Sequence, residues 1–477
     1  MRKPNIIFIL TDDQAQWAAG VYGNKEIYTP NIDKLAEEGV LFTHAFSAPV
    51  CSPSRAMIMT GLYPNKVGID DWISPDETEG LLPDKPTIAE ILKKAGYFTG
   101  LIGKWHLGKE EIYHPLNRGF DYFMGFLDGG NTPRDPILEV DGKKKQVKGF
   151  TIDIVTQDAI RFIRENKDKP FALFLHTREP HTPYTPVPPE DMAHYVNKKL
   201  TTPDIENFPI EKLYLLDAMH YYATNKPQIP MIEDMSEDKL QDMFRGYYAS
   251  ISSIDRNVGY ILAELDTLKL TDNTIVIFMS DNGYLLGHHG LVSKGNAAYI
   301  GTNIRRSNMF EHSIKVPLII RWPEVTKRGT ICNEIVCSLD FFPTFLEILK
   351  LTTEIELGEN LELDGISIFP LLEGKSVRTR EEIFLLYDMH HHNPYNWAEA
   401  HMRMLRTNTH KLVLHCEDER KNEFYSIDED PEEEKNIYGK EATGEIQRKL
   451  ASEISSYRKK IKDTVTHIQS STCEECQ

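Results

Sequence analysis

Acidic and amide side chains follow two apolar stretches of the sequence, at positions where they could bind a metal ion. Asp12 and Asp13 come after "NIIFIL", and Asp281 and Asn282 come after "TIVIFM". Three carboxylates and an amide oxygen form a set of hard oxygen donors, which favours calcium or magnesium over zinc. Each pair alone is also typical of a turn or a helix cap. The metal hypothesis therefore depends on the two pairs coming together in the fold.

A second group of side chains could bind an oxyanion. Lys104 and His106 lie two residues apart in "GLIGKWHLG". If this segment is extended, both side chains point the same way. The segment is not a phosphate-binding P-loop, because it lacks the upstream glycine and has Trp105 where serine or threonine is required. An ammonium group and an imidazole on one face suit a tetrahedral oxyanion.

Two further residues could join these groups. His181 lies between Pro180 and Pro183, which restrict its backbone, and Lys294 follows the Asp281-Asn282 pair by about a dozen residues. A single histidine or lysine is more often structural or solvated. Their importance therefore depends on convergence with the carboxylates.

Cys51 in "FSAPVCSPSRAMIMTG" has no obvious ordinary role. The residues after it resemble a helix, with Pro53 in the first turn and Arg55 one turn on. A thiolate nucleophile is favoured at a helix start, but not among carboxylates. Zinc thiolate chemistry is also mismatched with an oxygen donor set. A core thiol, half of a disulfide, a metal ligand, a nucleophile and a chemically altered residue all stay open.

The apolar stretches that precede these groups alternate with segments of helical period. "NIIFIL", "FTGLIG", "PFALFLH" and "NTIVIFMSD" alternate with "TPNIDKLAEEG", "TIAEILKKAGY", "TQDAIRFIRENK" and "GYILAELDTLKL". This alternation predicts an α/β fold with a large, doubly wound, mostly parallel sheet and helices on both faces. Ligands of such sheets bind at the carboxyl ends of the strands. The motifs "TDD", "SDNG" and "EPH" can therefore form one site.

Local patterns predict several details. We expect the first helix to have Asn31 as its N-cap and to stop at Gly39. The segment "ILEVDGKKKQVKGF" predicts a hairpin that turns at Asp141 and Gly142. Residues 185–245 are rich in proline and aromatic residues, and they predict a long irregular insertion near a site.

The sequence predicts two domains, with a boundary in the region 355–380. Residues 1–375 would form the large α/β domain that carries the candidate site, and residues 376–477 a smaller subdomain. In the latter, "EEIFLLYDMH", "HKLVLHC" and "EFYSIDEDPEEE" predict a small antiparallel sheet, and "GEIQRKLASEISSYRKKIK" predicts a terminal helix.

Composition restricts the class of protein and its partners. The 477 residues are 40% hydrophobic and 26% charged, as in soluble globular proteins, and the formal net charge is −18. Such an acidic surface repels nucleic acid and anionic membranes, so we expect neither as a partner. No apolar run reaches the roughly 20 residues of a membrane span. The N-terminus lacks a signal peptide pattern, so we expect a cytoplasmic protein, or an exported one if a signal has been removed.

The six cysteines are too sparse to imply a disulfide framework. Cys473 and Cys476 have C-x-x-C spacing at the C-terminus. A zinc or redox role is one hypothesis for this pair, and a frayed terminus is the other.

Several long motifs resemble the type I, formylglycine-dependent sulfatase family. "CSPSR" followed by "AMIMTGLYP" is similar to its C-x-P-S-R motif, and "GKWHLG" is similar to its second motif. "PNIIFILTDDQ", "TPNIDKLAEEGVLFTHAFS", "GFDYFMG", "PHTPY", "SDNGYLLGHHG", "KVPLIIRWP" and "EFYSIDEDPEEEKN" also resemble family segments, in the family's order. The resemblance runs from about residue 3 to residue 440. It implies the alkaline-phosphatase-like fold.

The resemblance also implies roles for the residues above. A separate maturase would oxidise Cys51 to formylglycine, an aldehyde carried as its hydrate. One calcium ion, with magnesium as an alternative, would be bound by Asp12, Asp13, Asp281, Asn282 and the modified Cys51. Arg55 would hold the modified side chain, Lys104 and Lys294 would bind the sulfate oxygens, His106 would steer the protons of the hydrate, and His181 would protonate or hydrogen-bond the leaving oxygen.

The expected reaction is hydrolysis of an organic sulfate monoester, with a small sulfated carbohydrate cut from a chain end as the preferred substrate. The sulfate monoester is an anion, so cationic groups must offset charge at the nucleophile. One preorganised donor contributes roughly 3 to 4 kcal/mol, and enzymes lower barriers by about 8 to 23 kcal/mol, so several are needed. A phosphonate monoester or phosphodiester hydrolase and a non-catalytic sulfate-ester binder are the alternatives.

Residues outside these motifs could contact the substrate. Asp70, Asp71 and Trp72 combine carboxylates with an aromatic ring, which suits sugar hydroxyls, although an exposed turn is an equal alternative. Arg178 stands with Glu179 where the family has a more apolar lead-in to "PH". His390 and His391, near His392 and His401, could lie at the pocket rim, in a surface loop or at a metal.

Overall fold

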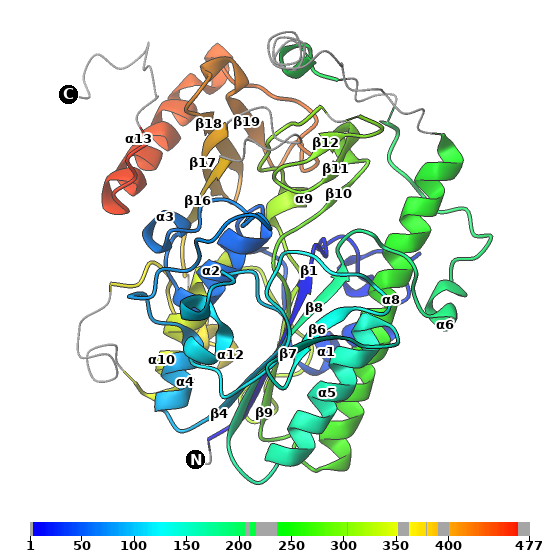
Figure 1. The fold of residues 1–477 in the computed structure, drawn as a ribbon. Helices are drawn as coiled ribbons and strands as arrows, with labels where there is room; N and C mark the ends of the chain where they lie inside the picture. The colour runs from blue at the N-terminus through cyan, green and yellow to red at the C-terminus, as the bar shows by residue number, and fades with distance from the viewer. Residues whose placement is uncertain are drawn as a thin grey trace.

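The computed structural model describes residues 3–205, 210–215, 236–302, 304–351, 362–377, 379–389 and 400–465. Its centre is a 10-stranded sheet in the order β14-β2-β13-β9-β1-β8-β4-β5-β6-β7 (Figure 1). The strands β1 (Asn5–Asp12), β8 (Phe171–Pro180), β4 (Phe98–Lys104), β5 (Tyr122–Phe126) and β9 (Thr274–Ser280) pair in parallel. The predicted mostly parallel sheet is confirmed.

Shorter strands extend both edges of this sheet. On one side lie β13 (Leu318–Arg321), antiparallel to β9 and to β2 (Val40–Phe42), and β14 (Thr330–Cys332). On the other side β6 (Ile137–Val140) and β7 (Lys143–Gln146) form the predicted hairpin. Its turn residues Asp141 and Gly142 have φ of 52° and 70°, as a tight hairpin turn requires.

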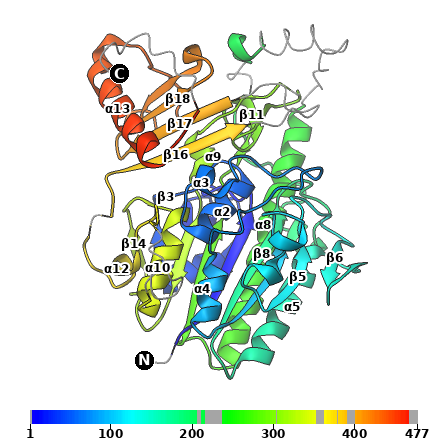
Figure 2. The ribbon, with the colours of Figure 1, turned by 60° about the vertical axis from the view of Figure 1, so that its left-hand side comes forward.

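Helices cover both faces of the sheet, because the central strand is apolar on both faces. Alternate residues of β1 face opposite ways: Ile6, Phe8 and Leu10 belong to one core, and Ile7 and Ile9 to the other. The first core is covered by α2 (Cys51–Thr60), α4 (Ile88–Lys94) and α10 (Phe341–Leu349). The second is covered by α1 (Pro30–Glu38), labelled in Figure 1, and by α5 (Thr151–Asn166) and α8 (Glu237–Thr267), which Figure 2 also labels.

The C-terminal part forms a separate antiparallel sheet, as predicted. Its strands β16 (Glu382–Met389), β17 (Ala400–Thr407), β18 (His410–His415) and β19 (Glu423–Ser426) pair in chain order, and the terminal helix α13 (Gly444–Lys460) packs against β17 and β18. The division of the chain at residue 375 stays a prediction.

Short elements complete the described part of the chain. Small sheets contain β3 (Ala45–Phe46), β15 (Val336–Cys337), β10 (Leu285–Leu286), β11 (Leu291–Ser293) and β12 (Ala298–Tyr299). Short helices are α3 (Pro64–Val67), α6 (Pro189–Met192), α9 (Glu311–Ile314) and α12 (Phe369–Leu372). Single 3-10 turns are η1 (Gly20–Tyr22), η2 (Glu111–Tyr113), η3 (Pro115–Asn117), η5 (His288–Gly290), η6 (Ser338–Asp340), η7 (Glu419–Lys421) and η8 (Glu441–Thr443). Within the described ranges, the structure contains no helix both long and apolar enough to cross a membrane.

Two local predictions were wrong. Asn31 is not the N-cap of α1, because the helix begins at Pro30 after Thr29, and Asn31 instead donates to the Asp255 carboxylate. The helix does end before Gly39, as predicted. The predicted irregular insertion 185–245 already contains α6, and from Glu237 onward it belongs to the 31-residue helix α8. Residues 206–209 and 216–235 of that insertion lie outside the described residues.

The pairing of β4 with β5 predicts a large effect of one methyl group. A Cβ at Gly125 would lie 1.9 Å from the carbonyl oxygen of its partner Gly103, a backbone atom that cannot move without breaking the pairing. We expect Gly125→Ala to lower the free energy of unfolding by about 3 kcal/mol or more, measured by urea titration. Gly130→Ala is the matched control, because nothing lies within 4 Å of its added Cβ. Equal stability of the two variants would contradict this account.

Candidate active site

Parallel strands bring the predicted metal ligands together at one edge of the sheet. Asp12 ends β1, Asp13 follows it, and Asp281 follows β9, the neighbour of β1. Cys51 is the first residue of α2. One ligand atom from each of Asp12, Asp13, Cys51 and Asp281 lies within 4.8 Å of the others, and all four residues are buried. Asn282 joins them, with its Nδ2 donating to Asp13 Oδ1 at 2.8 Å.

The Cys51 thiol lies between a carboxylate and an ammonium group. Its Sγ lies 3.1 Å from Asp12 Oδ1 and 2.6 Å from Lys294 Nζ. Burial raises the pKa of this thiol well above its ordinary value, and the carboxylates of Asp12 and Asp281 raise it further. The two nearby lysines act in the opposite direction but do not reverse the shift. The thiol is therefore neutral near pH 7 and a poor nucleophile.

Arg55 fixes the geometry around Asp281. Its Nε donates to Asp281 Oδ2 at 3.0 Å, its Nη2 forms an ion pair with the same oxygen at 2.9 Å, and its Nη1 donates to the Lys104 carbonyl at 3.1 Å. Burial raises the pKa of Asp281 to about 6, and the neighbouring carboxylate of Asp12 contributes to the shift. Arg55 thus joins the end of β4 to the end of β9 from within α2.

Two lysines face the carboxylates. Lys104 Nζ lies 2.6 Å from Asp12 Oδ2, and Lys294 Nζ forms an ion pair with Asp13 Oδ1. Burial opposes the charged form of Lys294, yet Asp13 and Cys51 hold its pKa well above the ordinary value. Burial would also raise the pKa of Asp12, but the surrounding cations, led by Lys104, hold it well below its usual range. The site is a buried array of fixed charges of both signs.

His106 is held as one neutral tautomer. The chain leaves β4 at Lys104, and His106 adopts a left-handed φ of 61°, so the segment from Lys104 to His106 is not extended throughout. Its Nε2 lies 2.9 Å from the Ile73 carbonyl oxygen, which can only accept a hydrogen bond. Burial, followed by Lys104, lowers the pKa of His106 well below its ordinary value. Nε2 therefore carries the proton, and Nδ1, which has no partner in the described part of the chain, carries a lone pair.

His181 lies at the open side of the cluster. Its Nε2 is 3.8 Å from Asp13 Oδ2, and its side chain is 25% exposed. Its Nδ1 lies 2.8 Å from the Thr182 carbonyl oxygen and so donates to it. Burial lowers the pKa of His181, while Asp13 acts to raise it. The fold thus brings all six predicted catalytic side chains to one place.

The predicted substrate residues have different fates. Asp71 is buried and accepts from the Tyr387 hydroxyl of β16 at 3.2 Å. Its segment is tied to the site, because Ile73 donates to Ser52 Oγ at 3.1 Å and accepts from His106. Asp70 and Trp72, on either side of Asp71, are half-buried.

The other predicted substrate residues are two histidines and one arginine. His390 and His391, with the adjacent His392, lie outside the described residues, as do the C-terminal cysteines. His401 lies on β17 and contacts Asp388 at 2.8 Å. Arg178 is 1% exposed, and its guanidinium donates to backbone carbonyls. A contact between Arg178 and the substrate stays a prediction.

The sequence analysis missed several buried residues that support the site. The Tyr247 hydroxyl from α8 donates to the Asp13 carbonyl at 2.7 Å. His176 Nδ1 from β8 lies 3.0 Å from the Lys104 carbonyl. Ser54 donates to the Asp281 carbonyl, and its place in "CSPSR" was a usable signal. Tyr247 and His176 belong to no such motif, and their contacts with backbone carbonyls form only in the folded chain.

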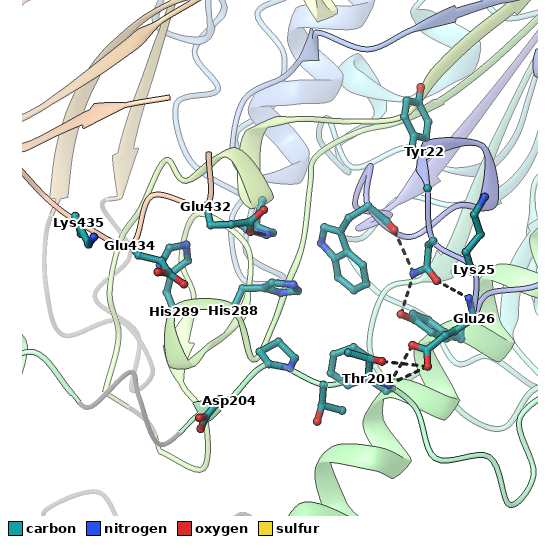
Figure 3. Close-up of a pocket in the computed structure, with 18 residues that line it drawn as sticks. Tyr22, Lys25, Glu26, Thr201, Asp204, His288, His289, Glu432, Glu434 and Lys435 are labelled. Carbon is teal, nitrogen blue, oxygen red and sulfur yellow. Dashed lines mark hydrogen bonds and ion pairs between the residues drawn. The ribbon is translucent and has the colours of Figure 1, made fainter. Parts of the chain in front are cut away.

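A separate pocket lies on the other side of the Tyr247 ring from Asp13. Its volume is about 1020 Å³, and the residues that line it include Trp17, Glu26, His288, His289, Glu432 and Lys435 (Figure 3). The Trp17 ring packs 5.8 Å from the Tyr247 ring, which itself contacts Asp13, so Tyr247 lies between the pocket and the carboxylates. None of the predicted catalytic residues lines this pocket. The predicted catalytic residues lie instead in the buried charge array.

Comparison with known proteins identifies the class. The sulfatase family model matches residues 4–351, and a model described as the C-terminal part of N-sulphoglucosamine sulphohydrolase matches residues 304–460. The chain belongs to the sulfatase family, whose members are sulfuric ester hydrolases.

Individual relatives extend over most of the chain. An N-acetylglucosamine-6-O-sulfatase of Bacteroides thetaiotaomicron is 29% identical, over 97% of this chain and 87% of the relative. Human steryl-sulfatase is 30% identical, over 83% of this chain and 74% of the relative. A solved structure in complex with its substrate D-glucosamine-2-N,6-O-disulfate matches with a TM-score of 0.78 and 27% identity, covering 97% of this chain and 99% of the other. A phosphonate monoester hydrolase of Agrobacterium radiobacter, with a TM-score of 0.71, 20% identity and 96% coverage of both chains, shares the fold.

Proposed function

We propose that this sulfatase is an exo-acting enzyme that removes sulfate from a sulfated carbohydrate. The nucleophile would be a formylglycine, made from Cys51 by a maturase, and the site would bind one calcium ion. The carrying observation is the environment of Cys51. Burial raises the pKa of its thiol, and the carboxylates of Asp12 and Asp281 raise it further, so a cysteine is a poor nucleophile there. Formylglycine, as its hydrate, supplies a hydroxyl nucleophile and can release sulfate by returning to the aldehyde. The motif position and the electrostatics therefore support the same proposal.

The residues at the site fit a calcium ion. Asp12, Asp13 and Asp281 place carboxylate oxygens close together, and Asn282 Oδ1 is buried with no hydrogen-bond partner in the described part of the chain. Calcium prefers such all-oxygen sets and takes six to eight ligands. When bound, calcium would offset the negative charge of the sulfate group and of the nucleophile. Magnesium is the alternative ion.

The cations of the chain would hold the sulfate group. Lys104 and Lys294 both carry their ammonium groups within the cluster, beside Asp12 and Asp13. In the proposed complex each lysine binds a sulfate oxygen and stabilises the charge that develops during transfer. Arg55 connects the start of α2 with Asp281, and in the proposed complex residue 51 then faces the sulfur atom of the substrate.

In the proposed reaction, one histidine would accept a proton from the nucleophile and the other would serve the leaving oxygen of the sulfate ester. His106 presents the Nδ1 lone pair, so it can accept a proton from the hydroxyl of residue 51. His181, with its Nδ1–H bound to Thr182, has only Nε2 free to serve the leaving oxygen. In this role the imidazole takes up a second proton at Nε2, which burial opposes and the Asp13 carboxylate at 3.8 Å favours.

A carbohydrate is the proposed substrate because of the groups beside the sulfate site. Asp70, Asp71 and Trp72 combine carboxylates with an indole ring, and Ile73 ties their segment to His106. Carboxylates accept hydrogen bonds from sugar hydroxyls, and an aromatic ring packs against the apolar face of a sugar. Relatives named for acetylated amino sugars and the solved disulfated glucosamine complex support this choice.

The direct test uses protein coexpressed with a formylglycine-generating maturase. Release of inorganic sulfate would be measured with defined sulfated monosaccharides, beside an aryl sulfate and an aryl phosphonate monoester. We expect sulfated sugars to have the highest kcat/KM. Faster turnover of the phosphonate would instead support the phosphonate hydrolase alternative, and binding without turnover of any ester would support a non-catalytic binder.

The proposed role of His181 predicts a dependence on the leaving group. We expect His181→Ala to lower kcat for a sugar sulfate by about 10²-fold or more, because a sugar alkoxide needs a proton as it leaves. For 4-nitrophenyl sulfate the loss should be much smaller, because nitrophenolate leaves without protonation. Steady-state kinetics on both substrates measure this difference. Equal losses would contradict a proton-donor role.

A further inference from the structure

Arg178 is a buried arginine directed at the backbone around His181. It lies on β8 and is 1% exposed. Its Nη2 donates to the carbonyl oxygens of His181 and Pro183, at 2.5 and 2.8 Å. Its own carbonyl oxygen accepts from the His181 amide at 3.1 Å. Arg178 therefore holds the turn that carries His181 both by its backbone and by its side chain.

This turn needs such a support. His181 comes directly after the last residue of β8, so its carbonyl has left the ladder of the sheet, and Pro183 has no N–H to donate. Arg178 Nη2 supplies a donor to both of these carbonyls from the buried side of the turn. The imidazole orientation depends on the same turn, because His181 Nδ1 donates to the carbonyl of Thr182, between the two carbonyls that Arg178 binds.

Arg178 also connects this turn with the loop beside His106. Its Nε donates to the Asn131 carbonyl at 2.7 Å. Two residues earlier, Gly129 packs so closely on His106 that a Cβ there would lie 2.5 Å from His106 Nε2. One guanidinium thus joins the segments that lie against both histidines of the site.

We propose that Arg178 is a positioning residue of the sulfatase reaction, which sets the orientation of His181 toward the leaving oxygen. This inference rests on the proposed role of His181 as the proton donor. It differs from a substrate contact, because the three hydrogen bonds of the guanidinium, made by Nε and Nη2, go to backbone carbonyls, while Nη1 lies 3.9 Å from the Glu179 carboxylate. Arginine suits this position, since its planar fork reaches three carbonyls at once, which a lysine ammonium on a flexible stem cannot reproduce with the same geometry.

The test is a comparison of leaving groups in matured enzyme. We expect Arg178→Gln to lower kcat for a sugar sulfate by about 10-fold or more, because a small misplacement of a proton donor is costly. KM should stay within about 2-fold, since substrate binding is unaffected, and kcat for 4-nitrophenyl sulfate should fall much less. Arg178→Lys should recover part of the loss, because it keeps a cationic donor.

A double-mutant cycle separates positioning from general damage. If Arg178 acts through His181, then adding Arg178→Gln to His181→Ala should cost little more than His181→Ala alone. Arg321→Gln is the matched control. Arg321 is 3% exposed and donates to Glu38, and it pairs with Val276 near the amino end of β9, far along the strand from Asp281. Its variant should lose stability without changing the preference between leaving groups.

Several results would overturn the inference. Equal losses on both substrates, additive losses in the cycle, or a rise in KM alone would each refute positioning through His181, and the last would restore a substrate contact. If Arg178→Gln does not fold, as judged by thermal unfolding, the same comparison is made with Arg178→Lys. A selective His181→Ala beside an unselective Arg178 variant overturns only this inference. An unselective His181→Ala overturns the proposed role of His181 and this inference with it.

Discussion

Cys51→Ala should abolish sulfate release, with kcat reduced by at least about 10³-fold, while the protein keeps its fold. Removal of the group that attacks sulfur leaves only binding and electrostatic stabilisation, which give a small residual rate. The side chain is small and sits among carboxylates that disfavour its ionised form. Stability should therefore change little, by less than about 2 kcal/mol in the free energy of unfolding.

The measurement combines sulfate release with peptide mass spectrometry of residue 51 in the wild type. The active fraction should follow the fraction of residue 51 that is converted to the aldehyde. Cys332→Ala is the control, since Cys332 is a partly buried cysteine on β14, outside the charge array. Turnover that persists in Cys51→Ala, or full activity with an unmodified thiol, would refute the proposal.

Calcium should stabilise the wild type and not the Asp13→Asn variant. An ion that binds only the folded state adds about 4 kcal/mol to the free energy of unfolding at a thousand times its Kd. Asn at position 13 removes one anionic ligand and the carboxylate partner of Lys294, so the ion should bind weakly. We expect a chelator to abolish activity of the wild type, calcium to restore it, and the variant to lose about 10²-fold or more in kcat.

Thermal unfolding with and without calcium checks this prediction independently of activity. Asp255→Asn is a matched control, because Asp255 is a buried carboxylate on α8 that binds the start of α1. It should unfold at a lower temperature but keep the shift caused by calcium. A calcium shift of equal size in Asp13→Asn would show that the ion binds elsewhere.

The layered sheet could be predicted because hydrophobic patterning records it. The residues of β1 are apolar on both faces, as is typical of strands in parallel sheets whose two faces are both covered. The direction of β13 could not be predicted, because an apolar run has the same pattern whether its strand is parallel or antiparallel to its neighbour. The cap at Thr29 was missed because Asn31 is also a good capping residue, and its use by Asp255 depends on a tertiary contact.

The convergence of the candidate metal ligands was predictable for a similar reason. The carboxyl ends of parallel strands lie at one edge of a sheet, so the strand pattern indicated that Asp12, Asp13 and Asp281 could share a site, and the pairing of β1 with β9 brings them together. The proposed conversion of Cys51 to formylglycine came from the resemblance of the surrounding motif to a family and not from the chemistry of the residue types alone. Arg178 could not be interpreted, because a charged residue predicts solvent or substrate, whereas here it serves carbonyl groups that only the folded turn exposes.

The burial of Cys51 has a consequence for the order of events in making this enzyme. The residue is 2% exposed in the folded chain, beneath the packed start of α2. A maturase could reach the thiol only while that helix is unformed or undocked. Folding and modification would therefore compete for the same newly made chain, and a molecule that folds first would be trapped as an inactive thiol form. On this view the active yield is a ratio of two rates, so a faster-folding variant could be the poorer enzyme preparation.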